Sequence, residues 1–293
     1  MNPAPSVIIF SVLSGLGFGY LAFLGFGVVH LSGWLAFGGW AIGYSLATIG
    51  LLAATFHLGN PQRAFLAFTQ WRSSWLSREA WAAVATLVIL APMALSDWLG
   101  LGLPQAIGML GGVLALVTVF TTSMIYAQIR AVPRWHHWIT PPMFVGFALA
   151  GGALLAGQTY LALGLLASLG LLLLWAWRVG DGQFARAGSD LATATGLGAI
   201  GEVAVFELPH TGGNYLLREM IYVVGRKHGQ KLRLIALVFA SIIPVVLLAL
   251  SAAVWVMVLA VLIHLTGAFV ARWLFFAQAE HVVGLYYGKR QLI

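Results

Sequence analysis

The sequence predicts an all-α integral membrane protein, a bundle of eight transmembrane helices. Of its 293 residues, 61% are hydrophobic and only 8% are charged, a balance that a soluble domain of this size does not have. Eight stretches approach or reach the roughly 20 apolar residues that a helix needs to cross a bilayer. With eight spans, all 15 lysines and arginines fall on one side of the membrane.

The first two spans are expected at residues 7–31 and 33–56, and they are rich in glycine. Gly15, Gly17 and Gly19 allow close helix approach, which most often serves packing and less often a ligand groove. Residues 234–271 carry no charge and are too long for one helix, so a tight turn is expected near residues 251–253. The other six spans are expected at 80–99, 105–126, 139–156, 160–177, 234–250 and 254–276.

The cations predict the orientation. By the positive-inside rule, both termini and the whole charged face are cytoplasmic, and the chain is a multi-pass protein of a bacterial inner membrane. The opposite side carries one fixed charge, Asp97. Seven or nine spans would scatter the cations over both faces.

The apolar runs leave no room for a separate globular domain, so residues 1–293 form one membrane domain with a long cytoplasmic strap at about 178–233. This strap is polar and glycine-rich, and we expect it to end in a short amphipathic helix at 215–225. An interfacial cap over the helix ends and a docking platform for a soluble partner are equally favoured.

Several classes of function are disfavoured by composition. The chain has no cysteine, which excludes disulfides and thiolate-ligated iron–sulfur clusters or zinc. No basic stripe interleaved with aromatic residues indicates nucleic-acid binding. A haem needs two histidines at similar depth, and only His264 and His30 approach this arrangement; we expect His264 to be a satisfied polar residue. We predict no catalytic centre and no metal ligands in this chain.

The stretch TFHLGNPQRAFLAF, residues 55–68, carries His57 past the expected end of the second helix, near Phe56. Glu79 opens the third helix, with Ser77 as its expected N-cap. Neighbouring helices joined by a short loop bring His57 and Glu79 to the same depth. Such a pair can move protons to and from a quinone. From spacing alone, a capping glutamate and a histidine bonded to a loop carbonyl explain the same residues.

Five segments of the chain resemble the dimethyl sulfoxide reductase membrane anchor subunit family, and the resemblance spans essentially the whole chain. They are HLGNPQRAF (57–65), SSWLSREA (73–80), GGNYLLREM (212–220), RKHG (226–229) and RWLFFAQAEHVVGLYY (272–287). The resemblance implies an eight-helix protein without haem. Such anchors hold a molybdopterin catalytic subunit and an iron–sulfur electron-transfer subunit to the membrane and exchange electrons with quinone. By position, His57 and Glu79 match the family's quinone-site histidine and acidic residue.

The expected cytoplasmic docking face and the strap ELPHTGGNYLLREM (207–220) are similar to the sulfite dehydrogenase branch of that family. We therefore expect a chain that passes electrons from sulfite to ubiquinone or menaquinone. His57 and Glu79 would handle protons, and Arg63 and Arg78 would steady the quinone headgroup or a partner's surface. The alternatives are an anchor of a dimethyl sulfoxide reductase that oxidises menaquinol, a haem b quinol cytochrome and a transporter. The spans hold almost no ionisable groups at mid-depth, which disfavours the transporter.

Overall fold

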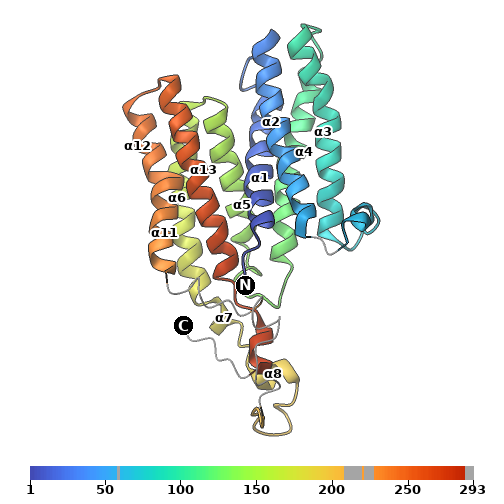
Figure 1. Ribbon diagram of the computed structural model, residues 1–293, viewed down its shortest axis with the longest axis vertical. Helices are drawn as coiled ribbons and strands as arrows, with labels where there is room; N and C mark the ends of the chain where they lie inside the picture. Colours follow the sequence, from blue (N-terminus) through green and yellow to red (C-terminus); the bar gives the residue numbers. More distant parts are fainter. Residues whose placement is uncertain (58–59, 208–219, 221–227, 288–293) are drawn as a thin grey trace.

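A computed structural model describes residues 1–57, 60–207, 220 and 228–287, and only the backbone of His57, Pro61 and Tyr287. Figure 1 shows a bundle of long helices with short helical segments gathered below one end. No β-strand occurs in the described residues, so the predicted all-α class is confirmed.

Seven helices in the described part of the chain are long and apolar enough to cross a membrane, and Thr140–Leu155 is a shorter apolar helix beside them. Together they give the predicted count of eight. The spans are α1 (Pro5–Gly25), α2 (Gly33–Ala53), α3 (Trp75–Leu99), α4 (Gln105–Ala127), α5 (Thr140–Leu155), α6 (Thr159–Asp181), α11 (Gly229–Leu237) with α12 (Ile243–Leu250), and α13 (Val254–Ala277).

Some predicted boundaries are wrong. Helix α3 begins at Trp75, five residues before the predicted start, because Ser74 is the residue that precedes the helix. Ser77, the expected N-cap, lies inside the first turn, where its hydroxyl accepts a hydrogen bond of 3.3 Å from the backbone N–H of Gln70. The seventh span contains an unpredicted π-helical segment, Val238–Ile242. The turn expected near 251–253 is confirmed, since α12 ends at Leu250 and α13 begins at Val254.

Helix α1 lies at the centre of the bundle, where it contacts α2, α4, α5 and α13. Glycines make these contacts close. A Cβ added at Gly17 would lie 2.3 Å from the backbone nitrogen of Ala47, and one at Gly19 would lie 2.0 Å from the carbonyl oxygen of Ala148. Backbones approach this closely only where no side chain intervenes. Gly17 and Gly19 therefore serve helix packing, as the commoner interpretation of this pattern predicts, whereas a Cβ at Gly15 would meet nothing within 4 Å.

The amino terminus, the connection between α4 and α5 and the segment after α13 meet at one end of the bundle. The Met1 ammonium donates to the carbonyl of Ala279 over 2.9 Å, and the N–H of Val282 donates to Ala131 over 3.0 Å. The described cations lie at or towards this end, which we call the cationic end: Arg63, Arg72, Arg78, Arg130, Arg134, Arg178, Arg186, Lys231, Arg233 and Arg272. At the other end, Asp97 accepts a 2.9 Å hydrogen bond from the Trp40 indole.

The strap begins later than predicted, because α6 continues to Asp181. It then forms two short helices, α7 (Gln183–Arg186) and α8 (Leu191–Thr195), which lie below the bundle in Figure 1. The 3-10 segment η4 (Val282–Tyr287) packs against α8. The predicted amphipathic helix at 215–225 lies outside the described residues, apart from Met220.

Candidate functional site

A large cavity of about 690 Å³ lies at the cationic end of the bundle. It is enclosed by α1, α2, α3 and α4 and by the connection between α2 and α3. Most of its lining side chains are apolar. Three of them, Leu52, Leu66 and Leu76, are about half exposed or more, at 61%, 58% and 48%. Because exposed leucines of a membrane helix face lipid, the cavity opens sideways towards the bilayer.

The connection between α2 and α3 forms one wall of the cavity. After Ala53 the chain tightens into the 3-10 segment η1 (Ala54–His57), and a second 3-10 segment, η2, runs from Pro61 to Phe68. Proline suits this first position, since its fixed φ fits a helix and its missing N–H would have no partner there. Ala64, Ala67 and Phe68 line the cavity, whereas Phe65 is 82% exposed. Segment η2 is thus an amphipathic piece placed to lie along the membrane interface.

Glu79 lines this cavity, yet only 3% of its surface is exposed. It lies in α3, one turn inside the helix start, and does not cap that helix. Its carboxyl makes a short hydrogen bond with the hydroxyl of Thr122 on α4. The capping interpretation of Glu79 is therefore wrong. A carboxyl so buried and facing a cavity needs either a counter-charge or a proton.

Thr122 is a suitable partner for both protonation states of Glu79. Its single O–H lies within reach of two acceptors, the Glu79 carboxyl and the backbone carbonyl of Thr118 at 2.9 Å. When the hydroxyl donates to Thr118, its lone pairs accept from protonated Glu79; when Glu79 is ionised, the hydroxyl donates to the carboxylate. The contact therefore survives proton gain or loss at Glu79 after a rotation of one hydroxyl.

The other predicted site residues are divided by the structure. Arg63 is exposed and lines the cavity with Glu79. Arg78 is not among the lining residues: its guanidinium donates to the carbonyls of Trp71 and Arg72 over 3.0 and 2.7 Å and lies 4.3 Å from the ring centre of Trp75. It thus fastens the loop that precedes α3.

His57 is the last residue of η1, and its side chain is not described. Its neighbours on both sides in the sequence, Thr55 and Asn60, line the cavity. The backbone therefore carries His57 past the wall of the cavity that contains Glu79.

A second, smaller cavity of about 20 Å³ begins on the other side of Thr122. It has room for about one water molecule and is lined by polar groups of Ser11, Ser14, Thr122, His264 and Arg272. Thr122 lines this space and binds Glu79, which lines the large cavity. One hydroxyl therefore connects the two spaces.

Arg272 was expected at a helix end, and this expectation is wrong. Its side chain is 5% exposed inside α13, with the guanidinium carbon 3.7 Å from the ring centre of Phe144. The aromatic face supplies part of the stabilisation that water would otherwise provide.

His264 is a satisfied core residue, as predicted. Its Nδ1 donates to the carbonyl of Ala240 over 2.7 Å, since a carbonyl only accepts. Sequence reasoning missed Thr122 and Tyr126, which also lines the large cavity; threonine and tyrosine inside apolar helices carry no pattern that marks them. Among the described residues, no group of three or more His, Asp or Glu side chains is placed to hold a metal ion.

An all-α membrane bundle with one cationic end and a lateral cavity beside a buried carboxyl is an integral membrane protein built to meet both lipid and a partner at that end. The chain belongs to the DMSO reductase anchor subunit (DmsC) family, whose sequence model matches residues 1–168. The family resemblance drawn from the sequence is confirmed.

Two curated relatives support this membership. A membrane-anchor relative from Allochromatium vinosum, named as a subunit of sulfite dehydrogenase, is 30% identical over 98% of this chain and 99% of the relative. Anaerobic dimethyl sulfoxide reductase chain YnfH of Escherichia coli K12 is 32% identical, over 38% of this chain and 40% of the relative. No solved structure matches the chain.

Proposed function

We propose that this chain is the quinone-reacting membrane anchor of a three-subunit molybdopterin and iron–sulfur oxidoreductase. One observation carries the proposal: the cavity of about 690 Å³ opens towards lipid and has the buried carboxyl of Glu79 in its wall. This volume lies within the roughly 300–1,000 Å³ of ordinary ligand pockets. The leucine- and alanine-rich wall suits an isoprenoid tail, and the polar groups gather where a headgroup would lie.

A bound quinone supplies two-electron chemistry that takes up or releases two protons. The chain's own residues then have three tasks. Glu79 holds or gives up a proton inside the cavity, with Thr122 as its partner in either state. His57 is the proton-coupled hydrogen-bond partner at the cationic end, because its backbone lies next to lining residues. Arg63 orients the headgroup or a partner's surface with its positive charge.

Sulfite is the electron source that we propose, and a molybdopterin subunit and an iron–sulfur subunit are the partners. The support is the match to the Allochromatium vinosum sulfite dehydrogenase protein along nearly the whole chain. An anchor of a dimethyl sulfoxide reductase that oxidises menaquinol is the second candidate, since YnfH matches over part of the chain. None of the substrate chemistry takes place on the anchor, so the two differ only in the partner and in the direction of electron flow.

Membranes that contain this chain and its soluble partners are expected to reduce a water-soluble quinone analogue when sulfite is added. Deleting the gene for this chain alone should abolish that reaction, because the lateral cavity is lost with it. Sulfite oxidation by an artificial acceptor should persist in the soluble fraction. Membranes that instead oxidise menaquinol with dimethyl sulfoxide, and show no reaction with sulfite, would establish the second candidate.

We also propose that the cationic end is cytoplasmic, because its arginines and lysines follow the positive-inside rule. The chain lacks cysteine, so single cysteines report their position cleanly. Gln62 is exposed at the cationic end, and Leu101, 60% exposed, lies at the other. A membrane-impermeant maleimide should label Leu101→Cys in intact cells and Gln62→Cys only after lysis. Labelling of Gln62→Cys in intact cells would reverse the orientation.

A further inference from the structure

A second pocket at the cationic end, of about 650 Å³, lies between α6 and α11, far along the chain from the quinone candidate. Its polar wall contains Arg178, Arg186 and Arg233 together with Asp181, so these four residues carry a formal charge of +2. Its apolar wall is formed by leucines of both helices. The pocket shares no lining residue with the large cavity described above.

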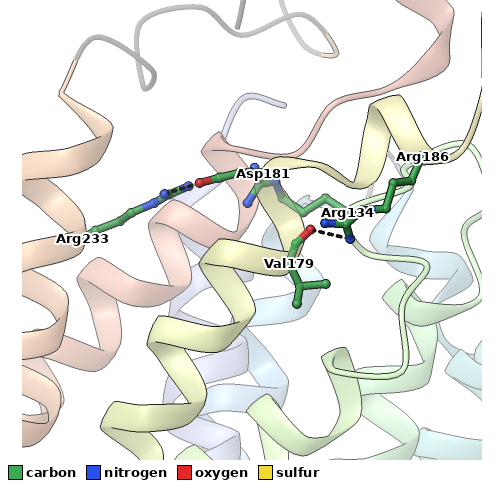
Figure 2. A network of polar contacts seen from close by, with 5 residues as sticks. All are labelled: Arg134, Val179, Asp181, Arg186 and Arg233. Atoms are coloured by element: carbon green, nitrogen blue, oxygen red, sulfur yellow. Dashed lines mark hydrogen bonds and ion pairs between the residues drawn. The ribbon is translucent and has the colours of Figure 1, made fainter.

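Asp181 fixes the frame of this pocket. Its carboxylate accepts from Arg233 over 2.7 Å and from Arg134 over 2.8 Å, so it joins the end of α6, the start of α11 and the connection between α4 and α5 (Figure 2). Both arginines are largely buried, at 11% and 15% exposure of the side chain. Burial lowers the pKa of Arg134, and its bond to Asp181 opposes that shift. The single carboxylate is thus committed to two guanidinium groups.

The remaining two arginines of the pocket are exposed and weakly held. Arg186 donates to the carbonyl of Val179 and to the side chain of Gln183, and both contacts measure 3.4 Å, at the long limit of hydrogen bonding (Figure 2). No ion pair of Arg178 or Arg186 is found among the described residues. Two guanidinium groups are therefore available to an anion.

The apolar wall lies on the lipid-facing side of the same helices. Leu174 is 49% exposed on α6, and Leu234 is 62% exposed at the corresponding depth of α11. Trp177 lies between the leucines and the arginines, with its ring centre 5.7 Å from the guanidinium carbon of Arg233. Tryptophan at a helix end marks the level of the lipid headgroups. Cations lie above this level and hydrocarbon-facing leucines lie below it.

We propose that this pocket binds the phosphate headgroup of an anionic phospholipid, with Arg178 and Arg186 on the phosphate and the acyl chains along Leu174 and Leu234. Guanidinium groups pair with phosphate through short, charge-assisted hydrogen bonds. A basic pocket between helix ends at the membrane surface is suited to anionic headgroups. A free phosphate ion would use the arginines but not the leucines, so the paired walls favour a lipid. The proposal does not depend on quinone chemistry.

The test is lipid retention by the full chain, purified in mild detergent with whatever proteins accompany it. Native mass spectrometry and phospholipid extraction should find bound phosphatidylglycerol or another anionic phospholipid. The double variant Arg178→Gln/Arg186→Gln should bind phosphatidylglycerol about thirtyfold more weakly in nanodiscs, since each arginine near a membrane surface contributes roughly fivefold. Lys231→Gln is the matched control, because Lys231 is exposed on α11 but does not line the pocket. It should retain the lipid.

Four results would overturn the assignment. The wild-type protein retains no anionic phospholipid, or Lys231→Gln loses lipid as readily as the double variant. Inorganic phosphate competes with the lipid and binds as tightly in lipid-free detergent, which would indicate a free-anion site. The double variant keeps its lipid and releases a soluble partner protein, which would make this surface a protein interface. Circular dichroism of both variants confirms that they remain folded, as exposed positions allow.

Discussion

Replacing Glu79 with glutamine is expected to lower sulfite-driven quinone reduction by about 10²–10⁴-fold, the usual contribution of a positioned acid–base group. Glutamine has the same shape and retains a hydrogen bond with Thr122, so the contact between α3 and α4 is kept. It has no proton to exchange at this position. The loss should therefore appear in turnover, with the complex still assembled in the membrane.

The measurement compares quinone reduction with the reduction of an artificial acceptor by the same preparation, because the second reaction bypasses this chain. Glu202→Gln is the control: Glu202 is an exposed carboxylate in the strap and does not line the cavity. It should behave as the wild type. Quinone reduction within about twofold of wild type in Glu79→Gln would contradict the assigned role.

Replacing His57 with alanine is expected to leave assembly intact and to abolish quinone-linked activity. A histidine both donates a hydrogen bond and moves a proton, and alanine does neither. His57→Gln separates these functions, since glutamine restores a hydrogen bond without proton transfer. We expect it to recover quinone binding, seen as a KM near that of the wild type, while kcat stays low.

His30 provides the matched control for His57, because it is exposed on the loop between α1 and α2 at the other end of the bundle. His30→Ala should keep full activity if the quinone is bound at the cationic end. The reverse pattern, with activity lost in His30→Ala and kept in His57→Ala, would place the quinone site at the opposite membrane surface. Both variants are measured with the same quinone assay and the same artificial acceptor.

The candidate site was predictable to different degrees for each residue. Glu79 and Arg63 were named from the sequence, and the structure brings them to one cavity. Arg78 was named with them, yet its guanidinium donates to the loop carbonyls of Trp71 and Arg72. A sequence pattern shows that an arginine lies near a helix start; which way its long side chain turns depends on the acceptors that the folded loop presents.

Thr122 and Arg272 show a different limit. Thr122 lies inside an apolar helix, 43 positions from Glu79, and their contact depends on the rotation of α3 and α4 about their axes. Arg272 is expected to be a helix-end cation because it lies near the end of an apolar run, but the ring of Phe144 on α5 receives it inside the bundle. No local period in the sequence encodes the partner of either side chain.

The sequence by itself determined the class of fold, the number of spans, the turn between the last two and the sharing of one end by the described cations. These properties follow from transfer free energies along the chain, which act on each segment separately. Tertiary structure alone decided that α1 lies at the centre, that Thr122 connects Glu79 to a second cavity and that Asp181 joins two arginines above a lipid-facing wall. Those outcomes depend on how closely helices approach and how they rotate, and the approach is set by contacts such as Gly19 against Ala148, between residues far apart in the chain.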